Sequence, residues 1–214
     1  LYPASRRHVV ASGVVDRVEF FVTRTTLVLG HGPKPVVDSI ENQRKPGVVY
    51  NAPNAHQSRL AKLLCERIPR VDLVRCTNSG TEATLNTIRA ARAVTGKSKI
   101  AKVEGGYHGS HDQVSVSVRV NPAKAGERSH PNAMAATEGL GEGTLEQVVV
   151  IPFNGTTVAR GTLESHKGEL AAVIIEPMLG SVGMLPATTE FLTMLRKFTA
   201  ANGIILIFDE VISY

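Results

Sequence analysis

The stretch Gly203–Tyr214, GIILIFDEVISY, decides the fold that the sequence predicts. Residues 204–208 are all apolar, and Gly203 and two acidic residues bound them. A short run of this kind is typical of a strand buried on both faces, as in a parallel sheet. The run ends in Asp209, and ligands of open α/β sheets bind at the carboxyl ends of strands. From this stretch alone, Asp209 either caps the next turn or is a ligand-binding carboxylate.

The rest of the chain alternates helical and strand-like segments. Apolar residues at helical spacing predict helices over residues 35–45, 56–68, 80–94, 156–167 and 188–202. Short runs rich in β-branched residues predict strands over residues 14–22, 25–29, 71–77, 100–103, 114–118, 148–151 and 170–175. Residues 121–143, rich in Gly, Pro and Ala, predict a long loop. This alternation predicts an α/β fold of three layers, in which helices cover both faces of a mostly parallel sheet.

Composition and charge narrow the class of protein. Of the 214 residues, 43% are hydrophobic and 20% are charged, as in an ordinary soluble globular protein. The net charge of +5 comes from scattered basic residues, which argues against a nucleic-acid partner and is compatible with an anionic small molecule. No segment approaches the roughly 20 apolar residues of a membrane span, and the first residues lack the apolar core of a secretory signal. Cys65 and Cys76 make no disulfide framework, so we expect a reduced, cytoplasmic protein.

The motif Thr77-Asn78-Ser79-Gly80-Thr81-Glu82-Ala83 opens a predicted helix. Ser79 and Glu82 have the spacing of a capping box, so one interpretation is simply a well-made helix start. The other interpretation is a phosphate site, because a helix N-terminus offers unpaired N–H groups and a positive dipole. In that case Gly80 admits an anion close to the backbone, and Ser79 and Thr81 add hydroxyl donors. No G-K-[ST] sequence follows, so this is not a nucleotide-binding Walker loop.

Two further motifs follow predicted strands. Glu104-Gly105-Gly106-Tyr107-His108-Gly109 comes directly after residues 100–103, and it is either a surface loop or a ligand loop in which Tyr107 stacks on a planar ring. Ile174-Ile175-Glu176-Pro177 precedes the glycine-rich turn Gly180-Ser181-Val182-Gly183. Glu176 is either a solvated residue before a proline or part of a site.

The candidate residues share one kind of position, because each lies at the end of a predicted strand. In a parallel sheet these ends meet at one edge, so phosphate donors, an aromatic ring, a polar turn and the Asp209 carboxylate can converge on one ligand. Such a carboxylate can form a charge-assisted bond with a protonated ring nitrogen. The set matches pyridoxal 5′-phosphate (PLP), whose protein partners include an acidic residue at the pyridinium nitrogen. We expect no metal in this site.

In this order, NSGTEA, EGGYHG, the Glu-Pro turn and IFDEV resemble the class III aminotransferases of fold type I, over about residues 29–211. The nearest branch resembles glutamate-1-semialdehyde 2,1-aminomutase. The resemblance implies a PLP-dependent transaminase or aminomutase that acts on small amino donors and acceptors and forms a homodimer. It further implies the roles of the site residues. The phosphate is held by Ser79, Gly80 and Thr81, the ring faces are covered by Tyr107 and Val211, the ring nitrogen is paired with Asp209, and His108 lies beside the ring.

Three departures from the family pattern affect this expectation. The Asp-Gly-Asn turn of the family has no match at residues 15–19. Ser181 stands where the aminomutase branch has Asn, so a direct contact with the cofactor and the mutase assignment are both weakened. The family's Schiff-base lysine lies on a later strand, and no lysine of this chain matches it, so no catalytic residue is assigned except Glu176 provisionally. A lysine amine serves there as covalent anchor and base, so we expect the 214 residues alone to be inactive.

We therefore predict that residues 1–45 belong to a small domain and that residues 46–214 form a PLP-binding large domain, incomplete at its C-terminus. Two alternatives stay open. One is a naturally truncated, non-catalytic protein of the same fold that binds a phosphate ligand or a partner subunit. The other is an unrelated α/β binding protein.

Overall fold

The computed structural model describes residues 8–11, 29–30, 32–49, 52, 54–69, 71–127 and 130–213. The chain divides into two compact units, one formed by Leu1–Val14 with Thr77–Tyr214 and the other by Val15–Cys76. The strands expected at 14–22 and 25–28 lie outside the described residues, and Leu29 lies in a turn. The boundary predicted at residues 45 and 46 stays a prediction.

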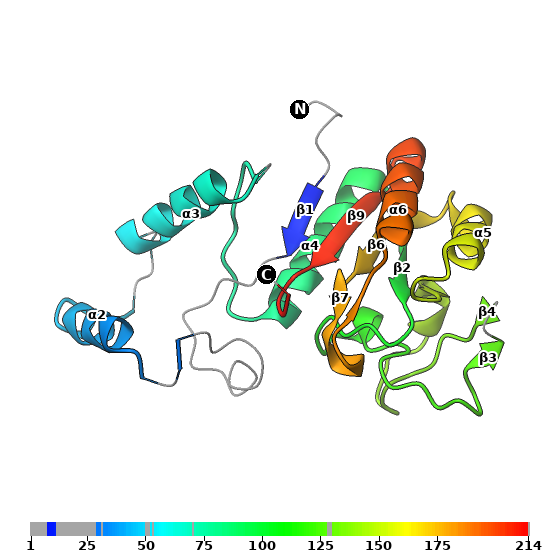
Figure 1. The fold of residues 1–214 in the computed structure, drawn as a ribbon, viewed down its shortest axis with the longest axis horizontal. Coiled ribbons are helices and arrows are strands. Elements are labelled where there is room, and N and C mark those ends of the chain that lie inside the picture. Colours follow the sequence, from blue (N-terminus) through cyan, green and yellow to red (C-terminus); the bar gives the residue numbers. More distant parts are fainter. Residues whose placement is uncertain are drawn as a thin grey trace. The chain divides into compact units, whose positions relative to one another are not determined.

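A five-stranded parallel sheet forms the centre of the first unit (Figure 1). It consists of β1 (His8–Ala11), β2 (Lys99–Val103), β5 (Val148–Ile151), β6 (Leu170–Ile175) and β9 (Ile205–Asp209), in the order β1-β9-β6-β2-β5. The run after Gly203 is thus a central strand, flanked by β1 and β6, and its residues 205–207 are at most 3% exposed. Because Ile175 of β6 pairs with Phe208 of β9, the residues that follow them, Glu176 and Asp209, lie at the same edge of the sheet.

Helices cover both faces of this sheet, which confirms the three-layer α/β fold. On one face, Ile100, Ile174 and Ile207 pack in one cluster with Ala83, Ile88 and Ala91 of α4 (Gly80–Thr95). On the other face, alternate strand residues pack with α5 (Thr156–His166) and α6 (Thr189–Asn202), through side chains that include Leu163, Phe191 and Leu195. Strand side chains point alternately to the two faces, so a strand between two helical layers needs apolar residues throughout.

Two of the expected strands are wrong. Residues 71–77 have no regular secondary structure and no ladder partner among the described residues, and Leu73 is 75% exposed. Residues 112–114 form a short 3-10 helix (η1), and only Val116 makes a bridge, to Ala135. In the first segment a β-branched composition is not enough, because a strand also needs a neighbour with free backbone groups. The second segment does exchange backbone hydrogen bonds with residues 134–136, but the 3-10 turn before it and the positive φ of Ser117 (49°) interrupt a regular strand.

Short elements complete the first unit. Two antiparallel pairs join β3 (Gly126–Glu127) to β4 (His130–Pro131) and β7 (Met178–Leu179) to β8 (Leu185–Pro186). The 3-10 helices η2 (Leu145–Gln147) and η3 (Gly180–Val182) lie in the connections. Most of residues 121–143 are loop, as expected, apart from the β3–β4 pair.

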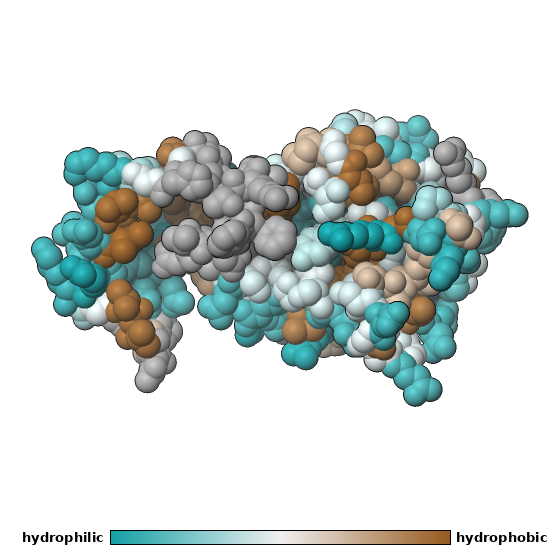
Figure 2. All heavy atoms as spheres, turned by 90° about the horizontal axis from the view of Figure 1, so that it is seen from below, coloured by the Kyte–Doolittle hydropathy of each residue, from teal (hydrophilic) through white to brown (hydrophobic). Residues whose placement is uncertain are grey.

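The second unit contains α2 (Lys34–Arg44) and α3 (Ala55–Arg67), close to the helices predicted at 35–45 and 56–68. Neither helix buries a residue, and Figure 2 shows apolar surface on this unit. The exposed apolar residues of the two helices are Val36, Val37, Ile40 and Leu63. Within the part of the chain that the structure describes, no helix is both long and apolar enough to span a bilayer.

Candidate functional site

The N-terminus of α4 carries the first predicted group of residues. Ser79 is the N-cap, and its Oγ accepts the N–H of Glu82 at 3.2 Å. The carboxylate of Glu82 in turn accepts the N–H of Asn78 at 2.8 Å. The interpretation as a well-made helix start is therefore correct, although the Glu82 carboxylate reaches the N–H of Asn78 and not that of the N-cap Ser79. It is compatible with an anion site, because the N–H groups of Gly80 and Thr81, in the first helical turn, have no intrahelical acceptor.

The loop after β2 packs against this helix start. Thr81 Oγ1 accepts the N–H of Ser110 at 3.3 Å. Gly109 has a φ of +105°, and a Cβ placed there would lie 2.7 Å from both Cα and Oγ1 of Thr81. Only glycine fits both the backbone conformation and this close approach. Buried Thr84 fixes the same loop from α4, since its hydroxyl donates to the carbonyl of His108 at 2.7 Å.

His108 and Asp209 form a buried pair at the edge of the sheet. The Nδ1 of His108 lies 2.9 Å from Oδ2 of Asp209, and their side chains are 0% and 5% exposed. Because an ionised carboxylate only accepts, the proton of this hydrogen bond belongs to Nδ1. The other ring nitrogen, Nε2, is buried and has no hydrogen-bond partner among the described residues. Asp209 Oδ1 accepts the N–H of Val211 at 3.2 Å, so neither carboxylate oxygen has used all of its lone pairs.

Val211 links this pair to the start of α4. A Cβ at Gly80 would lie 3.1 Å from Cγ2 of Val211, so the two residues are in contact. The contacts thus run in a circuit from Thr81 to Gly109, through the adjacent His108 to Asp209, and through Val211 to Gly80. Residues from three segments far apart in the sequence therefore surround one small region at the carboxyl edge of the sheet.

Tyr107 and Ser181 stand at the border of this region. Tyr107 directly precedes His108, and its side chain is 41% exposed. Ser181 lies exposed in η3 and makes no hydrogen bond with any described residue. The turn that carries it is nevertheless close, because a Cβ at Gly180 would lie 3.2 Å from Cγ2 of Ile212 and a Cβ at Gly105 would lie 3.4 Å from Cγ1 of Val182.

Glu176 joins the turn to the tyrosine loop. It is 3% exposed, its Oε1 accepts the N–H of Tyr107 at 2.8 Å, and its Oε2 accepts the N–H of Gly180 at 3.0 Å. Glu176 is therefore not a solvated residue before a proline. Burial raises its pKa, and Asp209 raises it further, while the two N–H groups and His108 lower it.

Other groups near the site also have perturbed protonation. Burial, and then the charge of Asp209, raise the pKa of Glu210. Lys102 is fully buried in β2, and burial lowers its pKa to about 7. Its Nζ donates to the carbonyls of Val116 at 2.6 Å and Val103 at 3.2 Å, which fixes the segment that follows η1. Sequence reasoning missed Lys102 and Thr84. The only sequence signal that could have identified Lys102 is its position, as a lysine within an otherwise apolar strand.

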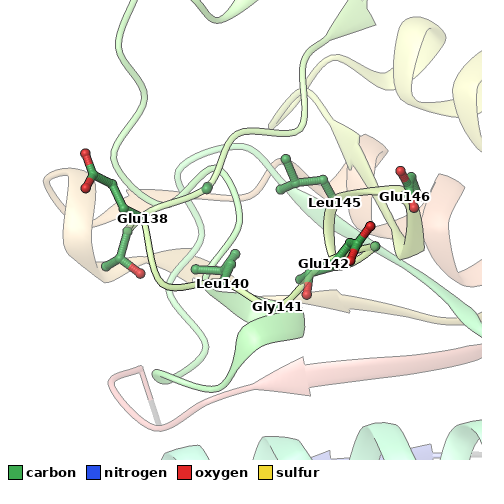
Figure 3. Close-up of a pocket in the computed structure, with 10 residues that line it drawn as sticks. Glu138, Leu140, Gly141, Glu142, Leu145 and Glu146 are labelled. Atoms are coloured by element: carbon green, nitrogen blue, oxygen red, sulfur yellow. The ribbon is translucent and has the colours of Figure 1, made fainter.

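The pocket drawn in Figure 3 is lined by residues 135–146 and contains none of the predicted site residues. Its labelled side chains include Glu138 and Glu142 of the long loop before β5 and Glu146 of η2. Among the described residues, no cluster of three or more His, Cys, Asp or Glu side chains is arranged to hold a metal ion.

Known proteins resemble this chain over most of its length. The family model described as aminotransferase class-III matches residues 17–213. A glutamate-1-semialdehyde 2,1-aminomutase from Methanococcus vannielii is 39% identical over 92% of this chain and 44% of its own length. An omega-transaminase from Sphaerobacter thermophilus superposes with a TM-score of 0.86 and 45% identity, covering 92% of this chain and 45% of that one. A structure described as a transaminase with PLP bound superposes with a TM-score of 0.81 and 37% identity, and the match covers 94% of this chain and 45% of that one. This chain thus spans less than half the length of each of these relatives.

Proposed function

The chain belongs to the class III aminotransferase family, and on that premise we propose that it forms the cofactor-binding part of a PLP-dependent transaminase or aminomutase. The observation that carries the proposal is the circuit of contacts that joins the tip of α4, the tyrosine-histidine loop and the end of β9. Its substrates are a small-molecule amino donor and acceptor. A homodimer in the cytoplasm, a small domain over residues 1–45 and a large domain from residue 46 belong to the same proposal.

The residues of the circuit fit the cofactor chemically. The N–H groups of Gly80 and Thr81, with the hydroxyl of Ser79, suit a phosphate. In this proposal Tyr107 and Val211 cover the two faces of a flat ring. The orphaned Nε2 of His108 lies buried in the same region and is suited to a polar group of the ligand.

Asp209 has the central role in this proposal. The cofactor supplies an electron-accepting pyridine ring that stabilises the electron pair left when a proton leaves the substrate Cα. Asp209, held by His108 and by the N–H of Val211, keeps a proton on the ring nitrogen, because a nearby negative charge favours the charged form of its partner. His108 fixes the direction of the carboxylate, and burial strengthens the attraction by excluding water.

The lysine that carries a proton between carbon atoms in this family is assigned to no residue of this chain. Lys102 is buried, but its Nζ already donates to two backbone carbonyls of its own neighbourhood. Transaminase and aminomutase chemistry differ in whether the amino group moves between two molecules or within one. Ser181 is exposed and forms no hydrogen bond with a described residue, so it favours neither.

The experiment is a calorimetric titration of the full-length protein with pyridoxamine 5′-phosphate, which has no aldehyde and so forms no adventitious link to surface lysines. We expect saturable binding, and loss of at least tenfold in affinity in Asp209→Ala, because a charged hydrogen bond contributes about 1.5–3 kcal/mol. Exposed Glu190→Ala is the matched control. A folded protein that does not bind contradicts the proposal. Binding without any turnover of amino donors favours the non-catalytic alternative instead.

A further inference from the structure

Four successive residues of the loop after β2 have their backbone N–H groups satisfied. Those of residues 104, 105 and 106 donate to the carbonyls of Ile151, Ser117 and Val103, at 2.9, 2.8 and 3.2 Å. The N–H of Tyr107 donates instead to a side chain, the carboxylate of Glu176. The backbone of Tyr107 therefore depends on one residue of another segment.

The same carboxylate holds the η3 turn. Glu176 Oε2 accepts the N–H of Gly180, and a Cβ at Gly180 would lie 3.4 Å from that oxygen, so the turn packs directly against the carboxylate. One buried group thus ties together two loops whose residues are about 70 positions apart, and each oxygen serves one loop. Such N–H···carboxylate bonds are short and charge-assisted.

Tyr107 has little else to fix its ring. Its side chain is 41% exposed, and within the described part of the chain its hydroxyl makes no hydrogen bond and its ring contacts no other aromatic ring. By holding the N–H of Tyr107, Glu176 fixes the backbone position from which the ring projects, and the ring torsions are then left for a bound ligand to select.

We propose that Glu176 is a positioning residue that bridges the backbone N–H groups of Tyr107 and Gly180, and so presets the backbone of Tyr107 and the η3 turn for a flat phosphorylated ligand. This inference rests on the proposed function and deepens it. Glu176 acts through Tyr107 and the turn and moves no proton itself. A carboxylate is required because both bonds need an acceptor. In glutamine, whichever way the amide lies, its NH2 group faces one of the two N–H donors.

The test uses a reporter in the full-length protein. Residues 1–214 contain no Trp, so Tyr107→Trp introduces an indole whose emission, corrected for any tryptophan elsewhere, is quenched when a pyridine ring stacks on it. Pyridoxamine 5′-phosphate is titrated into this reporter alone and combined with Glu176→Gln, Glu176→Asp or the exposed control Glu138→Gln. Aspartate keeps the charge but is one methylene too short to reach both N–H groups.

We expect Glu176→Gln and Glu176→Asp each to weaken binding about tenfold, as the loss of one charged hydrogen bond implies, and to reduce quenching at saturation. The reporter that also carries Glu138→Gln should have the same affinity and the same quenching as the reporter alone. A purely structural role would change the unfolding temperature but not the quenching of the saturated, folded protein.

The other outcomes are distinguishable. A reporter that binds nothing overturns the proposed function and this inference with it. Unchanged affinity and quenching in both Glu176 variants overturn the inference alone, as does an aspartate variant that behaves like the reporter. If a Glu176 variant loses the rate of amino-group transfer while its quenching is unchanged, Glu176 carries a proton, and the inference is overturned as well. If the variants do not fold, hydrogen exchange of the unmodified protein decides. Slow exchange at the Tyr107 and Gly180 amides supports the bridge, and exchange at the rate of a free loop contradicts it.

Discussion

Because the amine of Lys102 is buried, the free energy of unfolding depends on pH between neutral and alkaline values. Burial lowers its pKa from 10.5 to about 7, while the charges of Glu176 and Glu104 oppose the shift. Because one pKa unit corresponds to about 1.4 kcal/mol, the burial of this amine costs about 5 kcal/mol at pH 7 and below. Between pH 7 and 10.5 the folded state binds fewer protons than the unfolded state. The free energy of unfolding therefore rises with pH in that window, by up to about 1.4 kcal/mol per pH unit from this group.

Lys102→Met removes this titration and keeps a long side chain in the strand. Urea unfolding of the parent and the variant at pH 7.5, 8.5 and 9.5 gives the difference in their free energies of unfolding. We expect the parent to gain about 1 kcal/mol on the variant for each pH unit, whatever the variant costs at any single pH. Lys197→Met, which alters an exposed lysine of α6, should follow the parent at every pH. A difference between the parent and Lys102→Met that does not change with pH would refute the reasoning.

Three further substitutions test the packing of the loop against α4, with a glycine of α5 as the comparison. Gly109→Ala should lower the free energy of unfolding by about 2–4 kcal/mol, because the new Cβ meets Thr81 at 2.7 Å and φ is +105°. Gly161→Ala in α5, where a Cβ meets nothing within 4 Å, should raise the free energy of unfolding by about 0.5–1 kcal/mol. Thermal unfolding that ranks the two variants the other way would contradict this packing. Thr84→Val should cost about 1–3 kcal/mol in urea unfolding, because it leaves the buried carbonyl of His108 unpaired, and an unchanged midpoint would show that this bond contributes nothing.

The sequence predicted the core strands well, because burial between two helical layers demands apolar residues at every position. Residues 170–175 and 205–208 carry this signal without interruption, and both are strands. The cap at Ser79 was equally readable, since its partners lie within four residues. By contrast, β1 was missed, because its four residues pair with β9 from almost 200 positions away.

The sequence named candidate site residues but gave none of the contacts between them. Asp209 and His108 were both candidates, yet their pairing, across 101 positions, is a product of the sheet order. The bridging role of Glu176 gave no sequence signal at all, because its partners are backbone N–H groups, which every residue except proline has. The prediction of a strand at 71–77 was wrong although the local pattern is typical of a strand, because the described residues offer this segment no partner.

The most direct measurement is a crystal structure of the full-length protein with pyridoxamine 5′-phosphate. The account predicts the phosphate at the N–H groups of Gly80 and Thr81, the ring beside Tyr107 and the ring nitrogen within hydrogen-bond distance of Asp209. A ligand bound elsewhere, or one in the same region whose ring nitrogen does not reach that carboxylate, would contradict it.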